Sequence, residues 1–161
     1  MKSQIISITI ASLMLAMTAC KNEGFFSEPA EGALNGLINQ NKEPEFSFDW
    51  INKQQIVPGE NAVSGDGIEI VGWAMNPDSK EAPGKVFVAV NGTLFTAETG
   101  IARDDVANYF KNTAYQKSGF RAKFARSLFK PGAYSIELRV VSKDGKSYYS
   151  SAPDKAIVIK I

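Results

Sequence analysis

The sequence predicts an all-β fold, an antiparallel β-sandwich of about seven strands with one short helical turn. Three observations predict it. Apolar and polar residues alternate with a period of two in short runs, and Asn-Gly and Asp-Gly pairs separate several of these runs. No long stretch shows the period of 3.6 that is typical of a helical domain. We therefore expect one sandwich domain at residues 46–161.

The clearest strand pair surrounds Asn91 and Gly92. The run before them, KVFVAV at residues 85–90, places three valines on one face, and the run TLFT begins the return strand. Asn-Gly between such runs is a strong hairpin signal because a type I′ turn needs positive φ at both central positions. The pair Asp144 and Gly145 predicts a second hairpin of the same type.

Other runs complete the predicted sheets. Residues 68–75, IEIVGWAM, are expected to form a buried strand in which Trp73 anchors the core. Residues 120–124 and 134–140 alternate between apolar and charged or polar side chains, and residues 157–161 close the chain as a final strand.

One helical turn is expected at Asp104 to Phe110. Two aspartates stand at its start, where the helix dipole favours negative charge, and Val106 and Phe110 share a face.

The composition excludes several kinds of chemistry. The chain has no histidine and a single cysteine, Cys20, so a Ser-His-Asp triad, a histidine-ligated metal and an intrachain disulfide are excluded. Its 18 basic residues balance 17 acidic ones, and we expect no nucleic-acid partner. No aspartates are spaced as in a calcium-binding loop, so we expect no metal and no cofactor, and an enzyme is the least favoured reading.

The first 19 residues read as a signal peptide. Lys2 precedes a short apolar run that ends in small residues, and this run is short for a membrane span. The four residues that end at Cys20, Met-Thr-Ala-Cys, resemble a bacterial lipobox, with Met17 where leucine is usual. The alternative is an ordinary signal peptide that leaves Cys20 as a free thiol.

The lipobox resemblance implies a location in the cell envelope. It implies a diacylglyceryl thioether on Cys20 and an N-acyl chain such as palmitate, which together hold a protein on a membrane. Lys21 follows the cysteine where aspartate would indicate the inner membrane, so the resemblance favours the outer membrane, with the chain facing the periplasm or the cell surface. Residues 20–45 are rich in Gly, Pro, Asn and Glu, and we expect a flexible tether there.

The domain itself resembles a recurring bacterial Ig-like module with a Gly-Trp-Ala strand and an Arg-x-Asp-Val turn. That module occurs in surface and secreted proteins and at the tails of membrane glycosyltransferases acting on lipid-linked sugars. Asp104 stands where proline is common and Asn91 where aspartate is common. The resemblance implies an accessory β-sandwich with no established catalytic residues. It is carried by Phe48 to Asn52, Gly72 to Pro77, Val86 to Gly92, Arg103 to Val106, Gly119, Phe120 and Lys143 to Gly145.

Arg103 and Asp105 have two interpretations. They could form a clamp for a sugar or phosphate. The favoured interpretation is a structural ion pair that fixes a loop, with Arg103 holding a carboxylate through two donors and Asp105 capping the helix. Trp73 likewise could stack on a sugar, although its apolar surroundings favour the core.

A basic stripe is the other candidate surface. Six basic residues and no acid lie between Lys111 and Lys130, and they could face a polyanion such as lipopolysaccharide phosphates. The alternative is a solvated outer face neutralised by the acidic tether. The stripe comprises Lys111, Lys117, Arg121, Lys123, Arg126 and Lys130.

Three function classes therefore remain from the sequence, and the last of them, an enzyme, lacks any catalytic constellation. The first is a lipid-anchored structural or interaction module of the envelope, with another envelope protein or a glycan as partner. The second is a carbohydrate- or polyanion-binding module, indicated by the basic stripe and by Tyr148 and Tyr149.

Overall fold

The prediction of an all-β fold is confirmed. The structure is a computed structural model that describes residues 26–161. Strands make up 46% of it, and one α-helix is present in this range. In chain order the elements are β1 Ile38–Asn39, β2 Glu45–Ile51, β3 Gln54–Gln55, β4 Glu60–Ala62, β5 Gly67–Met75, β6 Lys85–Val90, β7 Thr93–Ile101, α1 Asp104–Phe110, β8 Gly119–Ala125, β9 Ala133–Val141, β10 Ser147–Ser150 and β11 Ile157–Lys160. Three 3₁₀ segments lie at Thr113–Lys117, Arg126–Leu128 and Pro153–Lys155. The described residues thus form eleven strands rather than about seven, because several are pairings of only two or three residues.

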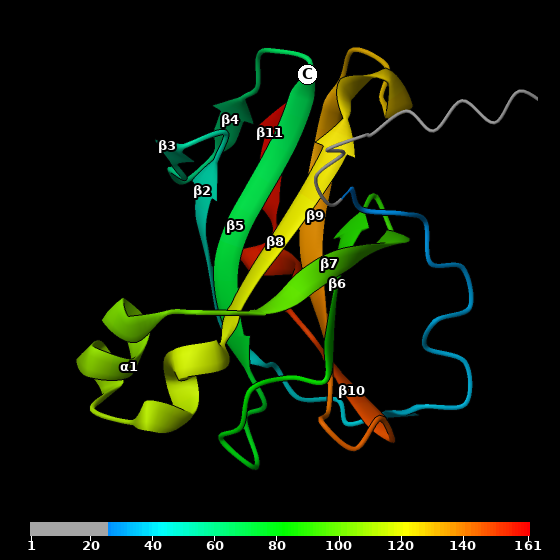
Figure 1. The fold of residues 1–161 in the computed structure, drawn as a ribbon. Coiled ribbons are helices and arrows are strands. Elements are labelled where there is room, and N and C mark those ends of the chain that lie inside the picture. Colours follow the sequence, from blue (N-terminus) through cyan, green and yellow to red (C-terminus); the bar gives the residue numbers. More distant parts are fainter. Residues whose placement is uncertain (1–25) are drawn as a thin grey trace, which may run out of the picture.

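The strands form two groups that β7 joins. In one group β5 lies between β2 and β8, and in the other β9 lies between β6 and both β10 and β11. The first half of β7 pairs with β6, where Val86 faces Ala97, and the second half pairs with β8, where Glu98 faces Arg121. Figure 1 shows β7 crossing between the two groups. All pairings are antiparallel except β1 with β10 and β4 with β11.

One hydrophobic core lies between the two groups. Both contribute side chains to it at every second position, as the period of a strand requires. Its fully buried members include Ile68 and Ile70 of β5, Phe120, Ala122 and Phe124 of β8, Val88 of β6, and Ile136, Leu138 and Val140 of β9.

The two predicted hairpins differ in outcome. Asn91 and Gly92 both have positive φ, 46° and 84°, and they join β6 to β7 as expected. Gly145 has positive φ, 71°, but Asp144 does not, so the prediction of a second type I′ turn is wrong. The loop is longer than a two-residue turn. It closes through a hydrogen bond from the Gly145 N–H to the Ser142 carbonyl, which needs only one residue with positive φ.

Trp73 is not in the main core, and the prediction that it anchors the core is wrong. The inward positions of β5 are Ile68, Ile70 and Ala74, so the period of two turns Trp73 to the outer face, where it is half-buried. The inward position beside it is Gly72, and a Cβ there would lie 2.1 Å from the Ser47 carbonyl oxygen and 2.8 Å from the Phe120 ring.

The segment before β2 is part of the folded domain. Where β7 leaves β8 to join β6, the backbone groups of β7 and β8 that no longer face each other need new partners. Ser27 supplies them to β8: its N–H donates to the Lys123 carbonyl (2.7 Å), and its Oγ accepts from the Lys123 N–H (2.9 Å). The Ala30 N–H donates to the Leu94 carbonyl of β7 (2.9 Å). We call residues 26–42 the strap.

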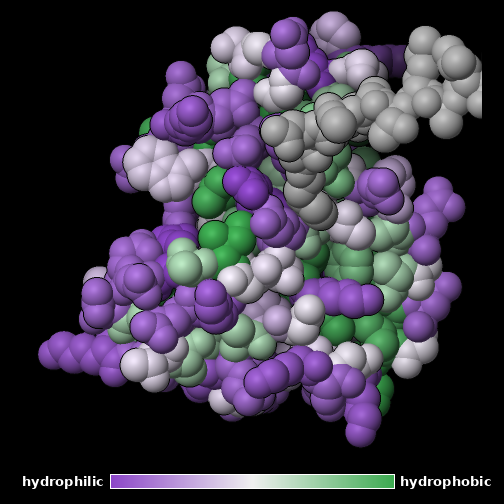
Figure 2. All heavy atoms as spheres, in the orientation of Figure 1, coloured by the Kyte–Doolittle hydropathy of each residue, from purple (hydrophilic) through white to green (hydrophobic). Residues whose placement is uncertain are grey.

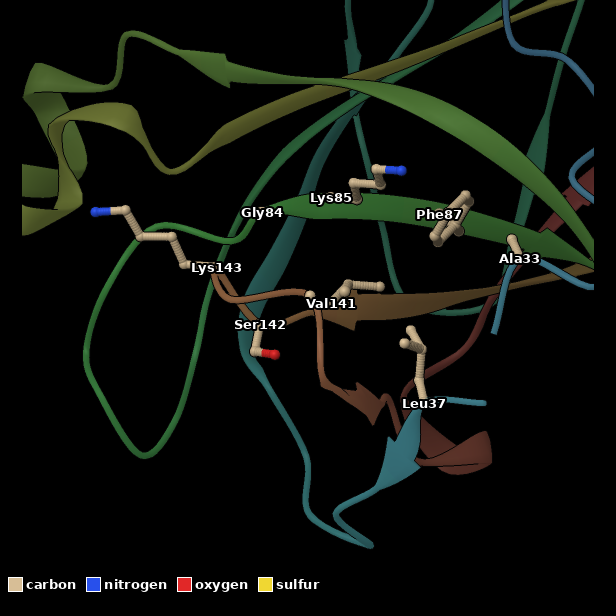
Figure 3. Close-up of a pocket in the computed structure, with 9 residues that line it drawn as sticks. Ala33, Leu37, Gly84, Lys85, Phe87, Val141, Ser142 and Lys143 are labelled. Atoms are coloured by element: carbon tan, nitrogen blue, oxygen red, sulfur yellow. The ribbon is translucent and has the colours of Figure 1, made fainter. Parts of the chain in front are cut away.

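The strap then crosses the outer side of β6. A cavity of about 210 Å³ lies between the strap and the sheet. Figure 3 shows Leu37 of the strap beside Val141 of β9, and Ala33 and Phe87 also line this cavity. Hydrophobic side chains are visible between β6 and the strap in Figure 2. Further along, β1 pairs with β10 in parallel, with Ile38 facing Ser147.

This structure differs from the flexible tether expected for residues 20–45. Residues 27–30 bond to β8 and β7 where the crossing of β7 leaves a gap, and after a series of turns residues 38–40 bond along β10. The folded unit therefore includes the strap, whereas residues 1–25, on which the expected signal peptide and Cys20 fall, lie outside the described residues.

Candidate functional site

A second, smaller apolar cluster lies under α1. Its buried members are Met75, Val106, Ala107 and Tyr115, and Trp73 packs against them. The expected helix is found at Asp104–Phe110, with Val106 facing this cluster.

The end of α1 brings four aromatic side chains together. The helix stops at Lys111, whose φ of 51° is left-handed, and the 3₁₀ segment that follows returns Tyr115 beneath Phe110. The two rings stack with centroids 4.6 Å apart. Trp73 meets Phe110 edge-on at 5.5 Å, and Tyr109 meets it at 5.0 Å. Tyr109 is 81% exposed and Phe110 is 41% exposed, so this cluster presents aromatic surface to solvent.

Arg103 lies beside these rings and holds two carboxylates. Its Nε and Nη2 donate to the two oxygens of Asp105 (2.8 and 2.7 Å), and its Nη1 donates to Asp49 Oδ2 (2.7 Å). The Arg103 and Asp49 side chains are only 17% and 19% exposed, whereas the Asp105 side chain is 67% exposed. The predicted helix cap is not found, because Asp105 engages Arg103 and no side chain caps α1.

Local backbone features place these charges. The register between β2 and β5 shifts between Phe48 and Trp50, so Asp49 is the extra residue of a β-bulge. Gly119 leaves room for the Arg103 side chain, since a Cβ there would lie 2.9 Å from the Arg103 Cγ.

The charges of the site are strongly paired. The hydrogen bonds from Arg103 lower the pKa of Asp105, and the bond to Asp105 raises the pKa of Arg103. Burial and a hydrogen bond to Glu45 raise the pKa of Tyr115 to about 12. Burial of Glu45 acts to raise its pKa, but hydrogen bonds from Lys80 and Tyr115 outweigh it, so the pKa of Glu45 is lowered. The carboxyl groups of Asp105 and Glu45 therefore stay ionised and paired at neutral pH.

Two hollows lie on either side of Trp73 and Phe110. The first, which we call the aromatic hollow, has a volume of about 370 Å³ and is lined by Ser47, Trp73, Arg103, Asp105, Val106, Tyr109 and Phe110. The second, of about 300 Å³, is lined by Pro44, Glu45, Phe46, Trp73, Phe110 and Lys155. Pockets of this size admit small ligands or segments of a chain molecule.

The basic residues between Lys111 and Lys130 contact different partners. Arg121 is paired with Glu98 on β7 (Nη2 to Oε2, 2.6 Å), and the Nη1 of Arg126 donates to the Val63 carbonyl (3.0 Å). The partner of Arg121 therefore comes from the neighbouring strand and not from the acidic segment before β2.

The remaining members of the stripe have other surroundings. The Lys123 Nζ is 5.1 Å from the centre of the Phe26 ring, a cation–π contact with the strap. Lys117 ends a 3₁₀ segment, and Lys130 is exposed in the loop before β9. Of the two tyrosines that suggested carbohydrate binding, Tyr149 is buried and donates to Asp78 (3.0 Å).

Sequence reasoning missed Asp49 and Tyr109. A signal was present for Asp49, an acid between the aromatic residues Phe48 and Trp50 in a strand. The sequence carries no comparable signal for Tyr109, because helical spacing places it only about 60° from the buried Val106, and its exposure of 81% is seen only in the structure.

Comparisons with models of protein families, with curated proteins and with solved structures found no match to this chain. Within residues 26–161 no helix is long and apolar enough to cross a membrane. The same residues hold no group of three or more acidic, histidine or cysteine side chains that could bind a metal ion.

Proposed function

We propose that this chain is a lipid-anchored protein of the bacterial cell envelope, whose Ig-like β-sandwich serves as a non-catalytic interaction module. Lipidation of Cys20 is supported by the resemblance of Met17 to Cys20 to a lipobox. The Ig-like sandwich is supported by two strand groups around one core, joined by a crossing strand. The resemblance to the module also gains support from two of its glycines: a Cβ at Gly72 would meet the Ser47 carbonyl oxygen, and one at Gly119 would meet the Arg103 side chain.

The position of the strap carries the proposal. Only five residues, 21–25, lie between Cys20 and Phe26, so the six steps of chain span at most about 21 Å even when fully extended. A lipid on Cys20 therefore holds the domain close to the membrane at the point where Ser27 joins β8.

The aromatic hollow lies toward the other end of β8. Ser27 bonds to Lys123, whereas Gly119, four residues away and about 13 Å along the strand, faces Trp73. Figure 1 shows the chain entering the described part near one end of β8, with α1 at the opposite end. The hollow is thus directed away from the anchor, where a partner has access to it.

The polyanion alternative has less support. Arg121 and Arg126 are engaged by Glu98 and the Val63 carbonyl, and Lys123 lies over the Phe26 ring, so three of the six cations already have a partner within the chain. The carbohydrate alternative has specific support from the aromatic hollow.

Replacement of the cysteine tests the anchor. Cys20→Ser should abolish incorporation of labelled palmitate and release the protein from membranes, because only a thiol forms the thioether. Thr18→Ala, which keeps a small residue before the cysteine, is the matched control and should label normally. A Cys20→Ser protein that still labels and stays in the membrane fraction would refute the proposal.

A further inference from the structure

We propose that the aromatic hollow binds a neutral glycan chain. This inference rests on the proposed function of the domain as an interaction module and assigns its ligand class.

The aromatic surface is larger than the fold requires. Val106 and Tyr115 already fill the space beneath α1, yet Tyr109 remains largely exposed and Phe110 partly exposed beside Trp73. Large exposed apolar groups that gather in one place mark binding sites on soluble domains. A sugar ring has one face of C–H groups that packs on an aromatic ring, which makes these three rings a suitable platform.

The polar rim matches the hydroxyl groups of a sugar. Arg103 has five N–H donors, and two of them have no partner among the described residues. Asp105 is exposed but held in place by the other donors, so it offers fixed acceptors at the edge of the rings. Ser47 adds a hydroxyl that lines the same hollow. Fixed donors and acceptors lose little freedom when a ligand binds.

The net charge of the rim selects against polyanions. One positive charge on Arg103 faces two negative charges on Asp49 and Asp105. A phosphate or sulfate would be repelled by the exposed Asp105, whereas a neutral sugar can accept from Arg103 and donate to Asp105. The site therefore favours neutral sugars, in contrast to the basic stripe.

The shape of the site favours a chain over a single sugar. The aromatic hollow and the second hollow share Trp73 and Phe110 as a common wall, so a ligand can cross the rings and occupy both sides. Two concave sites of about 300 and 370 Å³ suit successive sugar rings better than a flat protein surface, because protein interfaces need a much larger area.

Intrinsic fluorescence of Trp73 provides the test. The chain has two tryptophans, so a Trp50→Phe variant leaves Trp73 as the single reporter. The lipidated protein, in a detergent without sugar headgroups, is titrated with neutral tetrasaccharides of the β-glucan, α-glucan and N-acetylglucosamine series, and with a heparin octasaccharide. We expect saturable binding of at least one neutral tetrasaccharide and none of heparin.

Variants locate the binding. Tyr109→Ala removes an exposed ring without disturbing the core and should weaken binding at least about fivefold, as loss of one aromatic contact predicts. Leu128→Ala changes another exposed large side chain (54% exposed) that lies outside both hollows, so it is the matched control and should bind normally.

Three results would overturn the inference. The first is an unchanged Trp73 fluorescence with every neutral sugar up to about 10 mM, a concentration at which even millimolar affinity is detected. The second is binding of a neutral sugar that Tyr109→Ala leaves intact. The third is binding of heparin alone. None of these results bears on lipidation, because the Cys20→Ser test is independent of the ligand. The anchor and the glycan site can therefore fail separately.

Discussion

Ser27 tests whether the strap is part of the folded unit. The Ser27→Ala variant keeps the backbone of the strap and its N–H bond to the Lys123 carbonyl. It removes only the Oγ that accepts from the Lys123 N–H at 2.9 Å. Ser27 is 4% exposed, so water does not readily replace the lost hydroxyl.

The expected loss of stability follows from this geometry. A buried N–H that loses its acceptor costs about 1–3 kcal/mol. This is a substantial part of the 5–15 kcal/mol that is typical for the unfolding of a domain. In urea it corresponds to a decrease of about 1 M in the unfolding midpoint.

Urea unfolding of the chain from Lys21 onward, followed by far-UV circular dichroism, measures this loss. Ser127→Ala removes an exposed hydroxyl with no role in the fold and should unfold like the wild type. Ser151→Ala removes a buried acceptor of the Leu138 N–H and should lose a similar amount to Ser27→Ala. Hydrogen exchange of the Lys123 amide should also become faster in Ser27→Ala. An unchanged midpoint and an unchanged exchange rate would refute the account of the strap.

Three further predictions concern the site and its surroundings. Arg103→Ala should lower the free energy of unfolding by about 2–3 kcal/mol, because it leaves Asp49 poorly solvated and unpaired. Asp105→Ala should lower the free energy of unfolding by only about 0.5–1 kcal/mol because Asp105 is exposed. The double mutant should lose less stability than the sum of the two single losses. Additive losses would show that the two residues are not coupled. Gly72→Ala should cost about 3 kcal/mol, since its Cβ would overlap a backbone oxygen, and a variant that melts like the wild type would contradict this packing. The pKa of Asp105 lies below its ordinary value of 3.8, so the unfolded state binds more protons and the stability from this carboxylate is lost as the pH falls through its folded-state pKa. Asp105→Asn should therefore make the unfolding midpoint less sensitive to pH between about 5 and 2, and an unchanged pH dependence would argue against the ion pair.

The sequence was informative where a local rule decides the structure. Asn91 and Gly92 specify their turn because few other residues accept two positive φ angles in succession. Asp104 and Val106 mark the helix because the dipole and the apolar face act within one turn.

The sequence was misleading where distant contacts decide. Trp73 stands in an apolar run, but the parity of the strand assigns the core to Ile70 and Ala74 and leaves Trp73 outside. The strap has the composition of a tether, and only the crossing of β7 creates the gap that Ser27 fills.

The candidate site was half predictable. Arg103 and Asp105 are near each other in the sequence, so their pairing follows from proximity. Asp49 joins them through a β-bulge 54 residues earlier, and a register shift of this kind leaves no periodic signal in the sequence.

The N-terminal peptide of the mature protein tests the central claim most directly. Mass spectrometry of the protein extracted from bacterial membranes should find a first peptide that begins at Cys20 and carries a diacylglyceryl group and an N-acyl chain. A mature chain that begins at another residue, or a Cys20 with a free thiol, would contradict the assignment of a lipid-anchored envelope module.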